Sequence, residues 1–211
     1  MADKLKIPPT KSALLQLKRQ AAFLESGHAL LERKKDLLTR LVYERLAQYR
    51  KLRKEVRQSL EEAYHWLGVT QMRMGSRKLR VVAIGMPLAL EVSILPRSHL
   101  GVEYPAVTAR ELPLQPLGLI GTDASLDETR IRLAHMAVML ARLGEAETAL
   151  WRLLEEQRKT QKRVNALKYN VIPRYHNTIR FIQSSLEEEE RNTLFQIKLL
   201  REQEGDGANA F

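Results

Sequence analysis

A long heptad pattern near the N-terminus limits the possible folds of this chain more than any other feature. Between Thr10 and Leu67 there is no proline, and the only glycine is Gly27. Alternating steps of three and four residues from Leu14 define sixteen a and d positions, of which twelve are apolar. These positions are Leu14, Leu17, Ala21, Leu24, His28, Leu31, Lys35, Leu38, Val42, Arg45, Tyr49, Leu52, Val56, Ser59, Ala63 and Trp66. A repeat sustained over so many heptads predicts a coiled-coil helix.

Two short signals mark the expected ends of this helix. The sequence PPT at residues 8–10 is typical of a helix start, and Gly68 is typical of the residue that follows a helix end. We therefore expect a first coiled-coil segment over residues 1–68, with a helix roughly 85 Å long at 1.5 Å per residue.

A second helical segment is expected over residues 125–204. Ser125 and Glu128 have the spacing of a capping box. Apolar residues in the centre recur at a mean step slightly above 3.6 residues, which predicts a nearly straight or weakly right-handed seam. They are Val164, Leu167, Val171, Tyr175, Ile179, Ile182 and Leu186. Because the two segments are long and connected, an antiparallel pair is the simplest arrangement.

Pro173 lies inside the second seam. It has no N–H to donate to the carbonyl of Tyr169, and its ring should bend the helix. The apolar stripe continues in phase on both sides, so the sequence predicts a kink at Pro173 rather than a helix end. Two interpretations stay open: the kink has a mechanical role, or packing simply absorbs a tolerated proline.

The middle of the chain, residues 69–124, has a different composition. It holds five of the eight prolines and five of the ten glycines. The short runs VVAI, LEVSIL and VEYPAV are β-prone and are separated by turn residues. We expect an all-α fold: a long antiparallel two-helix coiled coil, with a small central subdomain that contains a short β-hairpin at its closed end. The polar tail over residues 205–211 is expected to be disordered.

Positive charge is concentrated in the first third of the chain. The formal net charge is +10. Residues 1–68 carry fifteen Lys and Arg against eight Asp and Glu, whereas residues 127–211 carry fourteen against thirteen. The partner of this basic helix would be nucleic acid or an acidic protein surface, and the alternative is a solvated face without a partner.

The sequence contains no pattern that would support catalysis. It has no P-loop, GxSxG, HExxH or EF-hand motif, and its five histidines lack metal-ligand spacing. The run EEEE at 187–190 does not suggest a cation site, because consecutive helical carboxylates point around the axis. The absence of cysteine fits a reducing compartment. We expect no cofactor, no metal, no signal peptide and no membrane span.

Stretches from three regions of the chain resemble the D subunits of V-type and archaeal or bacterial A-type rotary ATPases. The family's opening helix is similar to PTKSALLQLKRQAAFLESGHALLERKKDLL. Its second helix is similar to RKTQKRVNALKYNVIPRYHNTIRFIQSSLEEEERNTLFQIK. Its hairpin and the following loop are similar to HLGVEYPAV and GLIGTDASLDE. The resemblance covers nearly the whole chain, in order.

This resemblance implies a non-catalytic central rotor shaft. In the family, both termini insert into a head ring of alternating catalytic (A) and non-catalytic (B) subunits. The small F subunit lies along the shaft, and a funnel-shaped C or d subunit links the shaft to the membrane rotor ring. The resemblance therefore implies a cytoplasmic protein that is peripheral to the membrane, with no nucleic acid among its partners.

Two groups of contact residues are expected from the resemblance and the charge distribution. Contacts with the head, which would transmit torque, are expected at Lys11, Lys18, Arg19, Lys34, Lys35, Arg191, Phe195 and Lys198. Membrane-proximal docking is expected at Met86, Leu88, Leu95, Leu100, Val102 and Tyr104. The second group belongs to a segment more apolar than an exposed hairpin requires, which a local hydrophobic core would also explain.

Two other functions are compatible with these residues. A basic coiled-coil nucleic-acid-binding protein would bind with strong salt dependence. Its basic residues lack interleaved aromatic residues, which disfavours a platform for single strands. A coiled-coil scaffold without a motor role would not require a hairpin in the middle of the chain.

Overall fold

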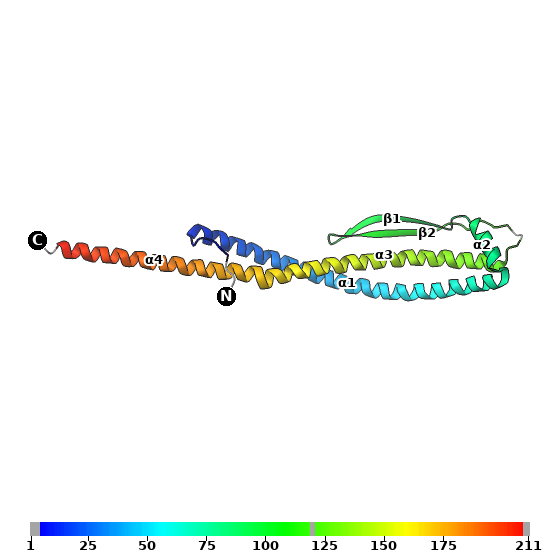
Figure 1. Ribbon diagram of the computed structural model, residues 1–211, viewed down its shortest axis with the longest axis horizontal. Helices are drawn as coiled ribbons and strands as arrows, with labels where there is room; N and C mark the ends of the chain where they lie inside the picture. Colours follow the sequence, from blue (N-terminus) through cyan, green and yellow to red (C-terminus); the bar gives the residue numbers. More distant parts are fainter. Residues whose placement is uncertain (1–4, 119–120, 209–211) are drawn as a thin grey trace. The chain divides into compact units, whose positions relative to one another are not determined.

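The computed structural model describes residues 5–118 and 121–208. The elements are α1 (Lys11–Met74), α2 (Ser76–Ile84), β1 (Leu90–His99), β2 (Val102–Glu111), α3 (Ala124–Ala166), the π-helical turn η1 (Leu167–Val171) and α4 (Ile172–Ala208). This order confirms the predicted class, a pair of long helices with a small β-hairpin between them in sequence (Figure 1). The chain forms two compact units: unit 1 contains residues 1–36 and 159–211, and unit 2 contains residues 37–158.

The predicted heptad seam is the buried side of α1. All sixteen a and d positions are buried or half-buried, and none is exposed. Leu17 and Ala21 belong to the core of unit 1, and Leu38 belongs to the core of unit 2. The spacing of apolar residues in α1 thus determines which face each unit buries.

The start of α1 agrees with the sequence, but its end does not. Thr10 caps the helix, because its Oγ1 accepts a hydrogen bond from the N–H of Ala13 at 3.1 Å. The predicted end at Gly68 is wrong, since α1 continues to Met74 and stops before Gly75, whose φ is +79°. The seam extends past Gly68 to the buried Thr70. Packing there outweighs the cost of about 1 kcal/mol for a helical glycine.

In unit 1, the first part of α1 lies antiparallel to α4. Its core consists of Leu17, Ala21, Ile179 and Ile182. The segment before α1 is attached to α4 as well, because the N–H of Leu5 donates to Thr178 Oγ1 at 3.0 Å and Ile7 packs on the core.

The chain remains helical through Pro173, as the continuous seam predicted. The π-helical turn η1 ends two residues before the proline, and the N–H of Ile172, which precedes the proline, donates to the carbonyl of Leu167. Proline leaves the carbonyl of Tyr169 without its usual donor, and the widened turn lies at that point. The side chain of Pro173 is exposed, away from the seam. A change in the direction of the helix axis at Pro173 stays a prediction.

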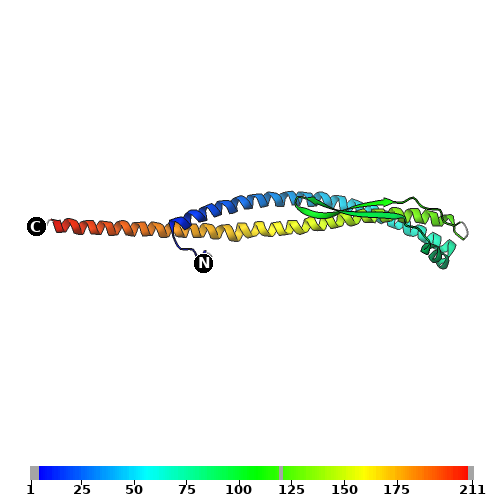
Figure 2. The ribbon, with the colours of Figure 1, turned by 90° about the horizontal axis from the view of Figure 1, so that it is seen from above.

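In unit 2, α1 and α3 form the helical pair and the β-hairpin packs on it (Figure 2). The strands are antiparallel, with register from Leu90↔Glu111 to His99↔Val102. Leu100 and Gly101 make the tight turn with φ of +53° and +75°. β2 is the inner strand: Val102 contacts Leu38 and Leu153, whereas β1 is exposed along nearly its whole length.

Two predictions for the middle segment are wrong. The β-prone run VVAI is not a strand but the end of α2, where Leu79 and Val82 provide helical spacing and Gly85 follows the last turn. The hairpin was also expected to sit at the closed end of the pair, but its strands run back along the helices (Figure 1). Its tip residue Val102 packs on Leu38 and Leu153, while the closed end is the α1–α3 junction at Thr70. Burial of the apolar face of β2 favours this position.

The boundaries of the second long segment differ from the sequence-based expectation. α3 begins at Ala124, and the predicted capping box is not formed, since Ser125 Oγ donates to Asp123 and Glu128 pairs with Arg132. Helix α4 continues to Ala208, so residues 205–208 of the expected disordered tail are helical. Residues 209–211 lie outside the described residues.

Candidate functional site: contact surfaces on two units

The end of α4 is not covered by any other segment that the structure describes. Every side chain from Glu187 to Arg201 is exposed. α1 begins at Lys11, which pairs with Glu190, so the helical pair of unit 1 ends near that contact. Five large apolar side chains are nevertheless exposed beyond it: Leu194, Phe195, Ile197, Leu199 and Leu200. Contiguous exposed apolar side chains of this kind mark an interaction surface.

The three predicted contact residues on α4 lie within this uncovered end. Arg191, Phe195 and Lys198 are all exposed. The four apolar neighbours of Phe195 were not predicted as contact residues. Their signal was present, because the run LFQIKLL continues the apolar pattern of α4 past the residues that face the start of α1.

The basic residues predicted on α1 fall into two groups. Lys11, Lys18 and Arg19 are exposed. Lys34 and Lys35 are half-buried, and Lys35 Nζ lies 3.0 Å from Asp36 Oδ1. All three members of the first group are accessible, although Lys11 also pairs with Glu190, and both members of the second group have contacts within the chain.

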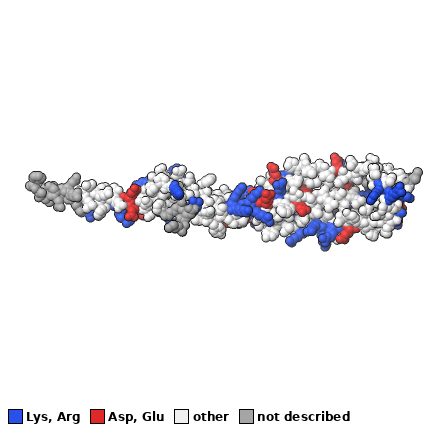
Figure 3. Space-filling view, in the orientation of Figure 1, with Lys and Arg blue, Asp and Glu red and all other residues white. Residues whose placement is uncertain are grey.

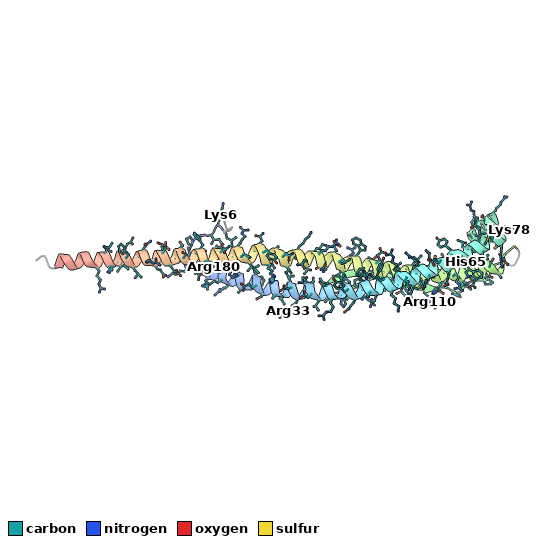
Figure 4. The ribbon with its side chains drawn as sticks, turned by 90° about the horizontal axis from the view of Figure 1, so that it is seen from below. Lys6, Arg33, His65, Lys78, Arg110 and Arg180 are labelled. Atoms are coloured by element: carbon teal, nitrogen blue, oxygen red, sulfur yellow. The ribbon has the colours of Figure 1, made fainter. Side chains whose placement is uncertain are left out.

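An ion pair joins the start of α1 to α4. Lys11 Nζ lies 2.7 Å from Glu190 Oε1, and this hydrogen bond and charge raise the pKa of Lys11 and lower the pKa of Glu190. Beside the pair is a surface hollow of about 420 Å³, lined by Leu186, Thr193 and Leu194 among others. A second cross-helix contact joins His176 Nε2 and Glu25 Oε1 at 2.8 Å. Figure 4 shows the outward side chains of this unit, with Arg33 and Arg180 labelled.

The residues predicted for membrane-proximal docking do not form one surface. Val102 and Tyr104 are only 6% and 7% exposed, and Val102 packs with Leu38 and Leu153 in the core of unit 2. Leu95 and Leu100 are exposed on the hairpin. Because both side chains are buried, Val102 and Tyr104 are not part of an exposed docking surface, and the local core explains the apolar character of Val102.

A separate exposed apolar group lies on and after α2. Met86 is half-buried and Leu88 is exposed in the connection between α2 and β1. Val81 and Ile84, on α2 itself, are also exposed and were not predicted from the sequence. The sequence did not point to Val81 and Ile84 as surface residues, because VVAI was predicted to be a strand.

The described residues contain neither of two common functional features. Within residues 5–118 and 121–208, no group of three or more His, Asp or Glu side chains is arranged to hold a metal ion. In the same part of the chain, no helix combines the length and apolar character needed to cross a membrane.

Comparison with known proteins covers nearly the whole chain. The family model for the D subunit of ATP synthase matches residues 13–202. The A-type ATP synthase D subunit of Pyrococcus furiosus is 35% identical over 205 residues, which are 95% of this chain and 96% of the relative. The V-type ATP synthase D subunit of Thermotoga neapolitana is 33% identical over 199 residues, covering 94% and 98%. The chain therefore belongs to the family of D subunits of A-type and V-type ATP synthases.

Proposed function

We propose that this chain is the central shaft of a rotary A-type or V-type ATP synthase. It transmits torque between a nucleotide-hydrolysing head and an ion-translocating membrane ring, and it is itself not catalytic. Family membership over residues 13–202 supports this role. The structural observation that carries it is the uncovered apolar end of α4, because a helix end of this kind suits insertion into a surrounding protein ring.

In this proposal, the two units contact different partner subunits. The α4 end and the exposed Lys11, Lys18 and Arg19 of unit 1 contact the A and B subunits of the head. In unit 2, the apolar group Val81, Ile84, Met86 and Leu88 docks on the funnel-shaped C or d subunit, which connects to the membrane ring. The F subunit lies along the helical pair. The complex places the chain on the cytoplasmic side, peripheral to the membrane.

The charge pattern supports contacts that form and break during rotation. A shaft must meet three similar head surfaces in succession without remaining bound to one of them. Exposed ion pairs contribute only about 0–1 kcal/mol each, so contacts through Lys18 and Arg19 are individually weak. Pairing of two helices along a buried seam gives the stiffness that torque transmission requires.

Reconstitution with the head tests the proposal. The full chain, with a bead attached, is combined with the A and B subunits, and ATP-driven rotation is recorded. Leu194→Ser with Phe195→Ser should weaken assembly about tenfold or more, because these side chains lose apolar contact area. Lys18→Glu with Arg19→Glu should permit assembly but lower the torque.

A charge reversal elsewhere provides the matched control. Arg97 and Arg142 are exposed in unit 2, and Arg97→Glu with Arg142→Glu should leave rotation unchanged. Failure of the wild-type chain to join the head would refute the shaft role. Rotation of the Lys18 and Arg19 variant at full torque would refute the assignment of these two residues.

A further inference from the structure

Four residues of α1 form a straight line on its outward side in unit 2. Tyr43, Arg50, Arg57 and Tyr64 follow one another at intervals of seven residues. In a coiled coil, residues seven apart keep the same angle to the seam, and each interval is about 10.5 Å long at 1.5 Å per residue. Arg53 and Lys54 lie between the two arginines on the same side. We call these six residues the outer stripe of α1.

The outer stripe is open to solvent. Tyr43 and Tyr64 are 69% and 59% exposed, and the four basic residues are exposed as well. Within the described part of the chain, no salt bridge involves any of the four. Their side chains surround a hollow of about 290 Å³. Figure 3 shows basic side chains gathered along the outer side of α1 in this unit.

This charge arrangement does not serve the stability of the helix. Arg50, Arg53, Lys54 and Arg57 have the spacing i, i+3, i+4 and i+7, so each cation lies beside another on the helix surface. Like charges at three- and four-residue spacing destabilise a helix by about 0.2–0.5 kcal/mol per pair. An acidic group on a partner would relieve this repulsion, which favours a binding role for the stripe.

The borders of the stripe favour a protein partner over nucleic acid. Glu44 precedes the basic residues and Glu61 follows them, both exposed. The positive region is therefore only about two helical turns long, and negative charge at its borders would repel a continuous polyphosphate. Tyrosine and arginine are among the residues that most often dominate protein interfaces. A partner helix along the line would meet both tyrosines as well as the cations.

We propose that the outer stripe of α1 binds an acidic α-helix of a partner protein. Carboxylates of the partner lie against Arg50, Arg53, Lys54 and Arg57, and apolar groups before and after them contact Tyr43 and Tyr64. The inference rests on residues of unit 2 alone. It does not depend on the torque role, whose test uses residues of unit 1.

Binding of synthetic peptides to the full-length chain tests this inference. The probe is a fluorescent helical peptide with four Glu at i, i+3, i+4 and i+7, flanked by leucines seven residues away. A second peptide has Gln in place of Glu, and a single-stranded DNA oligonucleotide serves as the competing class. The acidic peptide should bind at least about tenfold more tightly than the Gln peptide, with an affinity that falls as salt is added.

Two variants with equal net charge separate the stripe from general electrostatic attraction. Changing Arg50, Arg53, Lys54 and Arg57 to Gln should weaken binding of the acidic peptide at least about tenfold. Changing the exposed Arg77, Lys78, Arg80 and Arg97 to Gln should change it less than about twofold. Tyr43→Ala with Tyr64→Ala should weaken it about three- to tenfold, because apolar contact is lost.

Three results would overturn the proposal. Equal losses in the two Gln variants would mean that net charge alone attracts the peptide. Stripe-dependent binding of the oligonucleotide at similar affinity would assign the stripe to nucleic acid. Absence of binding by the wild-type chain would mean that the stripe is a solvated face. Melting curves of the variants confirm folding, and the stripe variant should melt at the wild-type temperature or higher.

Discussion

The Oγ1 atoms of Thr70 and Thr129 lie 2.8 Å apart inside unit 2, where the end of α1 meets the start of α3. Both hydroxyls also reach the carbonyl of Ser125, at 2.8 and 2.9 Å. All three residues are buried. Two hydroxyl protons are thus shared among three short contacts, and this polar group joins the two helices at their junction.

Removal of either hydroxyl should destabilise unit 2. Thr70→Val leaves a buried carbonyl with fewer donors, so the free energy of unfolding should fall by about 1–3 kcal/mol. Thr129→Val should have a similar effect. Chemical denaturation of the two single variants and the double variant gives the coupling free energy between the two hydroxyls. It should exceed about 0.5 kcal/mol, because both hydroxyls share the carbonyl of Ser125 as an acceptor.

A threonine outside the junction is the control. Thr148 Oγ1 donates a solvent-exposed hydrogen bond to the carbonyl of Gly144 in its own helix, and within the described part of the chain it has no other partner. Thr148→Val should change the free energy of unfolding by less than about 0.5 kcal/mol. Strict additivity of the two junction variants would contradict the shared arrangement.

Glu145 should control the attachment of the hairpin to the helices. Its Oε2 accepts a hydrogen bond from the backbone N–H of Val107 in β2 at 3.1 Å. In Glu145→Ala this amide loses its acceptor, so its hydrogen exchange should become faster, by about tenfold for a loss of about 1.4 kcal/mol. Exchange measured by NMR for residue 107 tests this.

Glu147 offers a matched comparison two residues further along α3. It is exposed, and Glu147→Ala should leave exchange at Val107 unchanged.

Val102→Ala provides an independent measurement of hairpin packing. It should lower the free energy of unfolding by about 1–3 kcal/mol, because a buried side chain between Leu38 and Leu153 is truncated. Unchanged exchange and stability in these variants would mean that the hairpin does not depend on these contacts.

Replacement of Pro173 should remove the reason for the π-helical turn. Pro173→Ala restores an N–H donor for the carbonyl of Tyr169, so η1 should become regular α-helix. The free energy of unfolding should rise by about 1–3 kcal/mol. A crystal structure of the variant and its denaturation curve test both effects. Arg180→Ala, at an exposed site of α4, is the control and should leave η1 intact. If η1 persists in Pro173→Ala, the proline is not the cause of the π-helical turn.

The Lys11–Glu190 pair should make the start of α1 sensitive to pH. Because Lys11 lowers the pKa of Glu190 in the folded state, the pair contributes stability at neutral pH and loses it as the pH falls through that lowered pKa. The pKa of Lys11 is shifted in the opposite direction, because it is raised in the folded state. The stability that this shift contributes is present at neutral pH and is lost only as the pH rises through the raised pKa.

An NMR titration of the Glu190 carboxyl tests the pair directly. In Lys11→Met the pKa of Glu190 should rise toward its ordinary value, because the hydrogen bond and the positive charge are both absent. Lys18→Met removes an exposed charge of the same sign and should have a much smaller effect. An identical pKa in the wild type and Lys11→Met would show that the pair does not form in solution.

The seams and turns were predictable because they depend on residues close together in sequence. Heptad spacing from Leu14 determined the buried face of α1, and Thr10 determined its start. The runs LEVSIL and VEYPAV became β1 and β2 as predicted, with Pro96 opposite Pro105 in the register. Both helical segments and the hairpin were thus encoded locally.

The candidate contact surfaces were only partly predictable. Phe195 and the basic residues could be chosen from sequence, but their exposure depends on where α1 starts relative to α4, which the Lys11–Glu190 contact defines. The helical state of VVAI was missed, because a short apolar run suits a strand and a helix equally.

The sequence by itself determined the periodicity of the long helices, the position of the hairpin in the chain and the concentration of basic residues in its first third. These properties follow from side-chain spacing and composition. Only the tertiary structure decided that Val102 and Tyr104 are buried, that the junction hydroxyls of Thr70 and Thr129 meet, and that no described segment covers the end of α4. Burial depends on which distant segment packs against a residue, and no local pattern specifies that choice.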